Sequence, residues 1–239
     1  MDSKSEQTLL AILSILVVGV FAFNTFLSFQ LNDALSNISS GGTLNTSLSV
    51  STQSSGVSGN ATLSAAQLAE AVVPRGVPAI YSAELGVSFE QPVQSLAILA
   101  PLDDQITLSG NDLQRYINIG TKISCEYCCG ADSIIFNTGE AACGCQHSYA
   151  MRGLAKYLIS KHGSQFSDEQ VLEELGKWKT MFFPKQIIQK AGLLAANNIE
   201  LNYINLASNK YRDVSRLQET AAQNSGSGLD SIPDMVGGC

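Results

Sequence analysis

Histidine is scarce in this 239-residue chain, which has two, and acidic residues outnumber basic ones by 21 to 14. The formal net charge of -7 and the lack of a basic aromatic patch argue against nucleic acid as a partner. The chain also lacks a Walker-type phosphate loop and a G-x-G-x-x-G motif. A cysteine enzyme would need an acid–base partner, and only His147 and His162 offer an imidazole. We therefore find no complete catalytic constellation.

A long run without charge lies near the amino-terminus. Residues 8–30 contain no charged side chain, and as a helix they would span roughly 34 Å, enough to cross a hydrocarbon core of about 30 Å. We predict a retained transmembrane anchor that contacts membrane lipid, preceded by a short cytoplasmic tail over residues 1–7. Two alternatives stay open, a signal peptide cleaved after Ala22 and a pilin-type leader cleaved before Glu6.

Serine, threonine and glycine dominate residues 31–73, which are too polar and too small to build a core. We expect a disordered stalk there. It contains three N-x-S/T sequons, at Asn37, Asn45 and Asn60, which are acceptors of N-linked glycans in exported segments. A Ser/Thr-rich linker also produces sequons by composition alone. We predict a single-pass protein of the cell membrane, with the stalk and the domain on the extracytoplasmic side.

Helical patterning dominates the next part of the chain, residues 74–222, for which we predict a small, mainly α domain. Residues 79–108 fit either short strands or short helices. Residues 223–239 are expected to form a linker and a carboxy-terminal tail ending in Cys239. Apolar spacing and capping signals predict helices from Gly110 to Gly120, from Ser148 to His162, from the capping box Ser167–Gln170 to Phe182, from Pro184 to the turn Asn197-Asn198, and over part of residues 199–222.

Five of the six cysteines fall between Cys125 and Cys145, first as C-x-x-C-C and then as C-x-C-x-H, ending at His147. Residues 134–140 read as a hairpin tip that folds the second group back on the first. The sequence therefore predicts an irregular or β-hairpin hub, rich in cysteine, at the start of the later helices. Its sulfur atoms are expected to converge on one point.

Thiolates and an imidazole at this spacing predict a site for a transition metal, zinc or copper. The C-x-x-C half is the usual zinc knuckle, and the excess of sulfur also suits Cu(I). Met151 follows His147 by one helical turn and could add a thioether, although core packing is the more ordinary role of such a methionine. The predicted ligands are Cys125, Cys128, Cys143, Cys145 and His147, with Cys129, Met151 and Cys239 as weaker candidates.

Two other interpretations of the cysteines stay open. In an oxidising compartment they would form up to three disulfides, in any of fifteen connectivities. The neighbours Cys128 and Cys129 would then take different partners, and Cys239 would attach the tail to the hub, where two glycines allow a close backbone approach. Alternatively, Cys125 and Cys128 would be a redox pair, although the helix predicted before Cys125 has its unfavourable end there and no basic residue lies between Cys125 and Cys145.

The segment Cys143-Gly144-Cys145, with His147 close behind and a helix following, resembles the motif of a family of membrane-tethered proteins named for the sequence P-C-Y-C-G-C. The proline and first cysteine of that motif are missing, since Ala141 and Ala142 precede Cys143. The resemblance implies a tethered, cysteine-rich module. The sequons and the acidic balance are also similar to those of archaeal surface proteins.

Together these features predict a membrane-anchored extracytoplasmic protein that binds a transition metal through a Cys/His cluster. The alternative is a structural cell-surface or filament subunit whose cysteines serve only as disulfides. Such a subunit would assemble through the apolar amino-terminal helix, with copies of itself or with another surface protein.

Overall fold

Helices provide nearly all the regular structure. A computed structural model describes residues 63–220 and 229–238, and in this part of the chain three isolated antiparallel bridges are the only β pairing. The prediction of a mainly α fold is therefore confirmed. The helices are α2 (Ala65–Val72), α3 (Ser82–Leu85), α4 (Pro92–Leu99), α5 (Leu102–Gln105), α6 (Gly110–Gly120), α7 (Gln146–His162), α8 (Asp168–Phe182), α9 (Pro184–Ala196), α10 (Tyr203–Ala207) and the 3-10 segment η1 (Asn209–Thr220).

Several predictions lie outside the described residues: the anchor over residues 8–30, the sequons at Asn37, Asn45 and Asn60, and the role of Cys239. Within residues 63–220 and 229–238, none of the helices combines the length and the apolar character that a membrane span requires.

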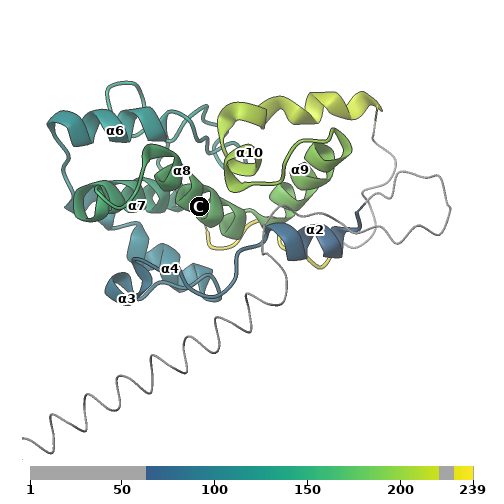
Figure 1. Cartoon of the computed structure of the whole chain (residues 1–239), viewed down its shortest axis with the longest axis horizontal. Helices are drawn as coiled ribbons and strands as arrows, with labels where there is room; N and C mark the ends of the chain where they lie inside the picture. The colour runs from purple at the N-terminus through teal and green to yellow at the C-terminus, as the bar shows by residue number, and fades with distance from the viewer. Residues whose placement is uncertain (1–62, 221–228, 239) are drawn as a thin grey trace, which may run out of the picture. The chain divides into compact units, whose positions relative to one another are not determined.

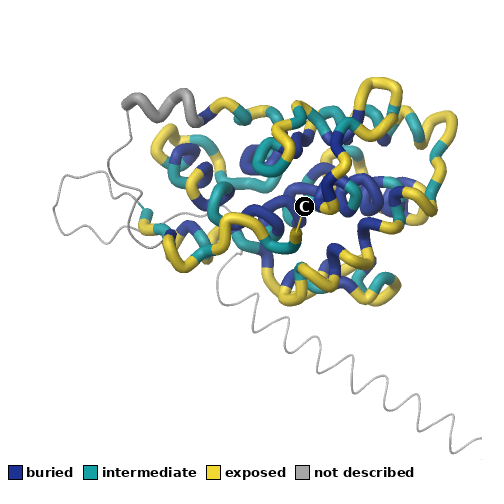
Figure 2. The backbone as a smooth tube through the Cα atoms, turned by 180° about the vertical axis from the view of Figure 1, so that it is seen from behind, coloured by how far each residue is buried: buried dark blue, intermediate teal, exposed yellow. Residues whose placement is uncertain are grey.

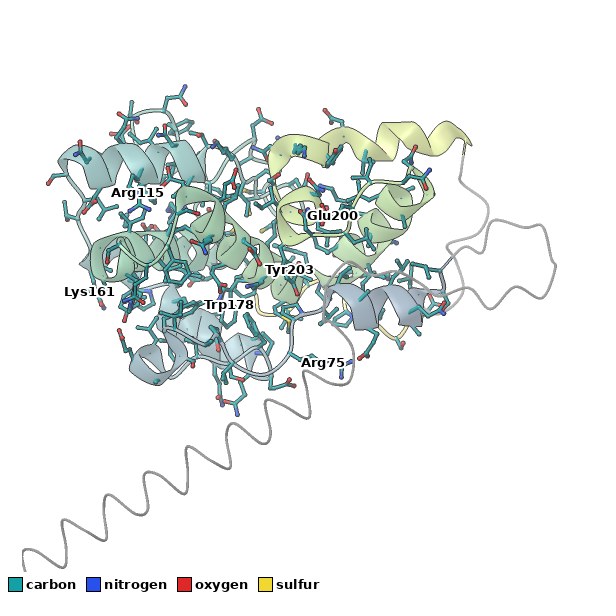
Figure 3. The ribbon with its side chains drawn as sticks, viewed as in Figure 1. Arg75, Arg115, Lys161, Trp178, Glu200 and Tyr203 are labelled. Atoms are coloured by element: carbon teal, nitrogen blue, oxygen red, sulfur yellow. A yellow bond between two sulfur atoms is a disulfide. The ribbon has the colours of Figure 1, made fainter. Side chains whose placement is uncertain are left out.

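The core is centred on α7 and α8, which pack against each other (Figure 1). Helices α4, α5 and α6 contact α7, and α10 packs on α8. Figure 2 shows the buried backbone running through these central helices, with exposed residues towards the outside. The single tryptophan, Trp178 on α8, is fully buried at this centre (Figure 3) and contacts the rings of Phe89 and Phe182.

Most helix boundaries agree with the predicted ones, because the local capping signals are strong. Ser167 and Gln170 form the expected capping box of α8, and Pro184 opens α9. Helix α6 covers the predicted residues, and the turn at Asn198 has a positive φ of 55°. Helix α7 begins two residues earlier than predicted, at Gln146, because the side chain of Cys145 caps it.

The amino-terminal boundary of the domain differs from the predicted one at residue 74. Residues assigned to the polar stalk form α2, which opens with a capping box between Ser64 and Gln67. Leu68 and Val72, one turn apart, are buried in a second apolar cluster with α9. The Ser/Thr-rich composition nearby concealed this short amphipathic pattern.

The segment that periodicity left ambiguous is also helical. Residues 79–108 form α3, α4 and α5, so the option of short strands is wrong there. The helix predicted over part of residues 199–222 is present as the short α10, and it is followed by η1, which is interrupted by non-helical backbone at Tyr211 and Asp213.

Candidate metal centre

The first cysteine group lies on a tight backbone turn after α6. Cys125 and Ala131 form an antiparallel bridge, and the carbonyl of Cys125 accepts hydrogen bonds from the amides of Cys128 and Gly130, at 3.4 and 3.0 Å. Gly130 has a positive φ of 72°, which a glycine adopts without the strain that a side chain would cause. The turn therefore brings Cys125 and Cys129 to the same side of the hub.

The second group is folded back by the predicted hairpin tip. Ile135 and Ala141 form an antiparallel bridge, closed by a hydrogen bond from the amide of Gly139 to the carbonyl of Phe136 at 2.9 Å. The amide of Ala142 then donates to Ile134. These contacts deliver Cys143 and Cys145 to the first group, and the pairing is confined to single bridges rather than strands.

The sulfur atoms of the two groups converge, as predicted. The Sγ atoms of Cys125, Cys129, Cys143 and Cys145 all lie within 4.8 Å of one another. Cys129 and Cys143 form a disulfide. Cys125 and Cys145 are free and buried, and their sulfurs lie 3.1 Å apart. The hub thus combines a disulfide with a pair of thiols.

Two of the predicted metal ligands, Cys128 and Cys143, are disulfide-bonded. Cys143 is bridged to Cys129, and Cys128 is also disulfide-bonded, so neither can act as a thiolate while its bridge is intact. The interpretation with cysteines only in disulfides is equally incomplete, because Cys125 and Cys145 keep their thiols. Cys128 and Cys129 are not bonded to each other, as their adjacency predicted.

His147 is fully buried between the rings of Phe182 and Phe183. Its Nε2 lies 2.8 Å from the carbonyl oxygen of Val236, and because a carbonyl only accepts, Nε2 must carry the proton. Nδ1 is then the nitrogen with a free lone pair, and it has no hydrogen-bond partner in the described part of the chain. A ring nitrogen of His147 lies within 4.8 Å of the sulfurs of Cys128 and Cys145.

The carboxy-terminal tail holds this histidine in place. The amide of Val236 donates to Phe182 at 2.9 Å while its carbonyl receives the His147 proton. Gly237 has a φ of 81°, and a side chain there would meet Leu96 at 2.7 Å. The close approach predicted from the two glycines of the tail is made by Gly237, whereas a Cβ added at Gly238 would meet no atom within 4 Å.

The two free thiols are not equivalent. A hydrogen bond from Cys125 lowers the pKa of Cys145, and the amide of Ser148 acts in the same direction against burial. The same sulfur–sulfur hydrogen bond, together with burial, raises the pKa of Cys125. Cys145, at the amino-terminus of α7, is therefore the thiolate of the pair, where the helix dipole also favours a negative charge.

Arg152 on α7 fixes the backbone that carries Cys143. It is fully buried, pairs with Asp103 at 2.7 Å, and donates from Nη1 to the Cys143 carbonyl at 2.7 Å and to the Ser148 hydroxyl at 2.8 Å. Arg152 is not among the site residues predicted from the sequence. The available signal was its position on the buried face of the helix, one turn after Ser148.

Replacing Arg152 with methionine is expected to lower the free energy of unfolding by about 3 kcal/mol, because it leaves buried carbonyl and carboxylate oxygens without their donor. Urea unfolding measures the change. Arg75→Met is the control, since Arg75 and its partner Glu70 are 66% and 71% exposed and such a pair contributes less than about 1 kcal/mol. Equal effects of the two substitutions would contradict the assigned role of Arg152.

Basic residues also approach the first cysteine group, although none is near in sequence. Lys179 of α8 is fully buried and its Nζ donates to Glu126, Ser124 and the carbonyl of Ala207. Its charge favours the thiolate form of Cys125. The sequence has no basic residue between Cys125 and Cys145, and the fold supplies a cation from α8 instead.

Lys190 of α9 shares the same carboxylate. The side chain of Lys190 is 4% exposed, and its Nζ lies 4.0 Å from a carboxylate oxygen of Glu126. This Nζ has no hydrogen-bond partner among the described residues. Burial lowers the pKa of Lys190 to about 8, and the nearby charges of Lys179 and Arg212 add to this against the attraction of Glu126. The charged form of Lys190 therefore lowers the free energy of unfolding.

Replacing Lys190 with methionine is expected to raise the free energy of unfolding by about 2 kcal/mol at pH 7. The folded state binds the proton less tightly, with a pKa of about 8 against 10.5, so wild-type stability rises with pH between these values and the advantage of the variant fades. Urea unfolding at pH 7 and pH 10 tests this, with the exposed Lys122→Met as control. An advantage of Lys190→Met that does not change with pH would contradict the account.

The remaining candidates are placed as follows. Met151 is completely buried in the main apolar cluster, which is the core role considered for it. Cys128 does not form a dithiol pair with Cys125, because it is disulfide-bonded while Cys125 is free. His162 lies in the last turn of α7, and its Nε2 contacts Glu84 at 3.2 Å.

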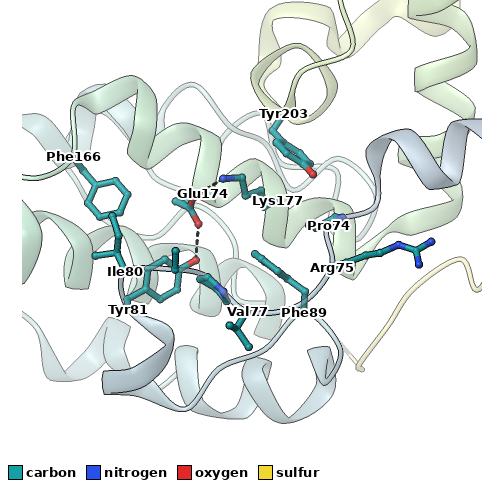
Figure 4. Close-up of a pocket in the computed structure, with 12 residues that line it drawn as sticks. Pro74, Arg75, Val77, Ile80, Tyr81, Phe89, Phe166, Glu174, Lys177 and Tyr203 are labelled. Carbon is teal, nitrogen blue, oxygen red and sulfur yellow. Dashed lines mark hydrogen bonds and ion pairs between the residues drawn. The ribbon is translucent and has the colours of Figure 1, made fainter. Parts of the chain in front are cut away.

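A separate cavity of about 350 Å³ lies away from the cysteines (Figure 4). Aromatic and aliphatic side chains form its walls, including Tyr81, Phe89 and Tyr203. Its carboxylate, Glu174, accepts a hydrogen bond from the Tyr81 hydroxyl at 2.8 Å and pairs with Lys177 at 2.7 Å. Glu174 thus satisfies Tyr81 and Lys177, and no cysteine or histidine lines the cavity.

No protein-family model, curated protein or solved structure matches this chain. The case for a function therefore rests on the hub itself, a cysteine cluster that could hold a metal ion and that contains the Cys129–Cys143 disulfide.

Proposed function

We propose that the protein binds one thiophilic transition metal ion, Zn(II) or Cu(I), through Cys125, Cys145 and His147. The observation that carries the proposal is the orientation of His147, whose Nε2–H donates to Val236 and whose buried Nδ1 is left without a partner. A backbone carbonyl that fixes the tautomer in this way is typical of metal-binding histidines.

The donor set fits such ions. Two thiolates and an imidazole with one open position form a known type of zinc site, and thiolate donors also suit Cu(I). Cys145 is common to both groups of neighbouring donors, the four sulfurs and the Cys128–Cys145–His147 group. Cys125 and His147 fall in different groups. Cys145 would therefore be the central ligand, and a bound ion would have to draw Cys125 and His147 together around it.

We propose further that residues 8–30 anchor the protein in membrane lipid, with the metal-binding domain outside the cytoplasm. The apolar run and the three sequons support this topology. The Cys129–Cys143 disulfide supports it as well, because such bridges persist in oxidising compartments. Membrane fractionation of the native cells tests it, and a protein that leaves the membrane in high-salt or carbonate washes would contradict an integral anchor.

The metal proposal is tested by titrating the full chain under anaerobic conditions, without reductant, against a chromophoric chelator. We expect binding of about one Zn(II) or Cu(I) per chain. Bound metal should also protect Cys125 and Cys145, and no other cysteine, from alkylation by N-ethylmaleimide. Full alkylation of both thiols in the presence of excess metal would overturn the proposal.

A further inference from the structure

The hub places a disulfide directly beside a pair of free thiols. We propose that it undergoes an internal thiol–disulfide exchange, which passes two electrons between the Cys129–Cys143 pair, exposed at Cys129, and the buried Cys125–Cys145 pair. The exchange is distinct from metal binding and needs no metal. An experiment can therefore contradict one of the two proposals without contradicting the other.

The geometry supports direct exchange. Thiol–disulfide exchange requires a thiolate to reach a sulfur of the bridge, and all four sulfurs lie within 4.8 Å of one another. Cys145 is the better placed nucleophile, since its sulfur accepts a hydrogen bond from the amide of Ser148 at the start of α7. Cys125 lies 3.1 Å behind it, in position to resolve the mixed disulfide.

The exchange balances without an outside reactant. In the first step, the thiolate of Cys145 attacks the sulfur of Cys143, so that the Cys145–Cys143 bond forms and the Cys129–Cys143 bond breaks. Cys129 leaves as a thiolate and takes up the proton that Cys145 gave up. Cys125 then attacks Cys145 and releases Cys143, which takes the proton of Cys125. One disulfide and two thiols are present before and after, but the disulfide has moved to Cys125–Cys145.

The four cysteines differ in burial, so an external thiol can reach only one side of the cluster. Cys129 is exposed, whereas Cys125, Cys143 and Cys145 are 0%, 6% and 8% exposed. An external thiol therefore meets the cluster at Cys129. A dithiol reductant that opens the surface bridge supplies two electrons, becomes a disulfide itself, and leaves Cys129 and Cys143 as thiols. Internal exchange can then deliver these electrons to a buried Cys125–Cys145 bridge that the reductant does not reach.

The rate of reduction of the buried pair tests the proposal. The full chain is treated with a metal chelator, oxidised with diamide so that Cys125 and Cys145 bridge, and mixed with dithiothreitol. Acid quenching, alkylation and peptide mapping follow each thiol with time. We expect thiols at Cys125 and Cys145 to appear at least tenfold more slowly in the double variant Cys129→Ser, Cys143→Ser than in the wild type. An equal or faster rate in a variant with the wild-type circular dichroism spectrum would overturn the proposal.

A trapping experiment decides the question if the double variant does not fold. Cys125→Ser removes the resolving thiol but leaves the surface bridge and its attacker, so exchange should stop after the first step. We expect mapped peptides of this variant to contain Cys145 bridged to Cys143 or Cys129 in about a tenth of the molecules or more. A variant in which Cys145 is entirely free and the Cys129–Cys143 bridge is fully retained would show that the attack does not occur.

Discussion

Replacing Cys145 with serine is expected to weaken the binding of Zn(II) or Cu(I) by about 100-fold. The metal-binding free energy of a four-donor zinc site, about 10–16 kcal/mol, corresponds to about 3 kcal/mol per donor, and each 1.4 kcal/mol is tenfold in affinity. Serine keeps the capping role of residue 145 at the start of α7, because its hydroxyl also accepts from a helix amide. The fold should therefore survive. Competition against a chelator of known affinity measures the loss.

Gly144→Ala is the matched control for this substitution. Gly144 lies between Cys143 and Cys145, and its backbone does not require glycine. An added Cβ would meet no atom within 4 Å. Its metal affinity should equal that of the wild type. If Cys145→Ser binds metal as tightly as Gly144→Ala, Cys145 is not a ligand and the proposed site is wrong.

Replacing Gly153 with alanine is expected to lower the free energy of unfolding by about 3 kcal/mol, the upper end of the usual cost of overpacking. Gly153 lies on α7 where the helix crosses α4 and α5. A Cβ there would lie 2.3 Å from the carbonyl oxygen of Leu99 and 2.9 Å from the amide nitrogen of Asp103. These are backbone atoms that cannot rotate away, so the helices must separate. Urea unfolding of the two proteins measures the change.

The same substitution should disturb the hub, because α7 also carries Cys145 and His147. Gly192→Ala on α9 is the control: its Cβ would meet only Leu68, at an ordinary 3.4 Å. Since alanine is the better helix former, this control should be neutral or more stable by up to about 1 kcal/mol. Similar stabilities for Gly153→Ala and Gly192→Ala would contradict the close packing of α7 against α4 and α5.

The fold was predictable from the sequence where local chemistry decides it. The capping box at Ser167 and the proline at position 184 specify where α8 and α9 begin, whatever the rest of the chain does. Helix α2 was missed because its stability comes from tertiary contacts of Leu68 and Val72 with α9. Its Ser64–Gln67 capping box is the same kind of signal as that of α8, but the Ser/Thr-rich composition around it concealed this box in the sequence.

The candidate site was predictable in its location but not in its bonding. Spacing alone indicated that two sulfur-bearing turns would meet, and they do. Which sulfurs bridge and which stay free depends on positions that differ by a few ångströms, as between Cys143 and Cys145, and no spacing rule resolves such a difference. The division into a Cys129–Cys143 disulfide and a Cys125–Cys145 thiol pair therefore required coordinates.

The residues that support the site were also beyond the reach of sequence patterns. Lys179 reaches the Cys125 region from α8, more than fifty residues away along the chain, and Arg152 connects α7 to Asp103 and to the Cys143 carbonyl. The tautomer of His147 is set by the carbonyl of Val236 in the tail. All three are long-range contacts. For Lys179 and Arg152, the only sign in the sequence was a charged residue on an apolar helix face.

Metal binding and disulfide exchange would use the same two thiols, so they should compete. A metal ion on Cys125 and Cys145 removes both the nucleophile and the resolving thiol. Oxidation of the pair would in turn release the metal. The hub would then hold either an ion or a second disulfide, depending on the supply of thiols at Cys129.

The X-ray absorption spectrum of the zinc-loaded full chain, prepared without reductant, tests the central claim most directly. Two thiolates and His147 predict two sulfur neighbours at about 2.3 Å and the remaining ligands, nitrogen or oxygen, at about 2.0–2.2 Å. A zinc shell of nitrogen and oxygen alone would contradict the proposed site. Four sulfur neighbours would contradict the intact Cys129–Cys143 bridge on which the account depends.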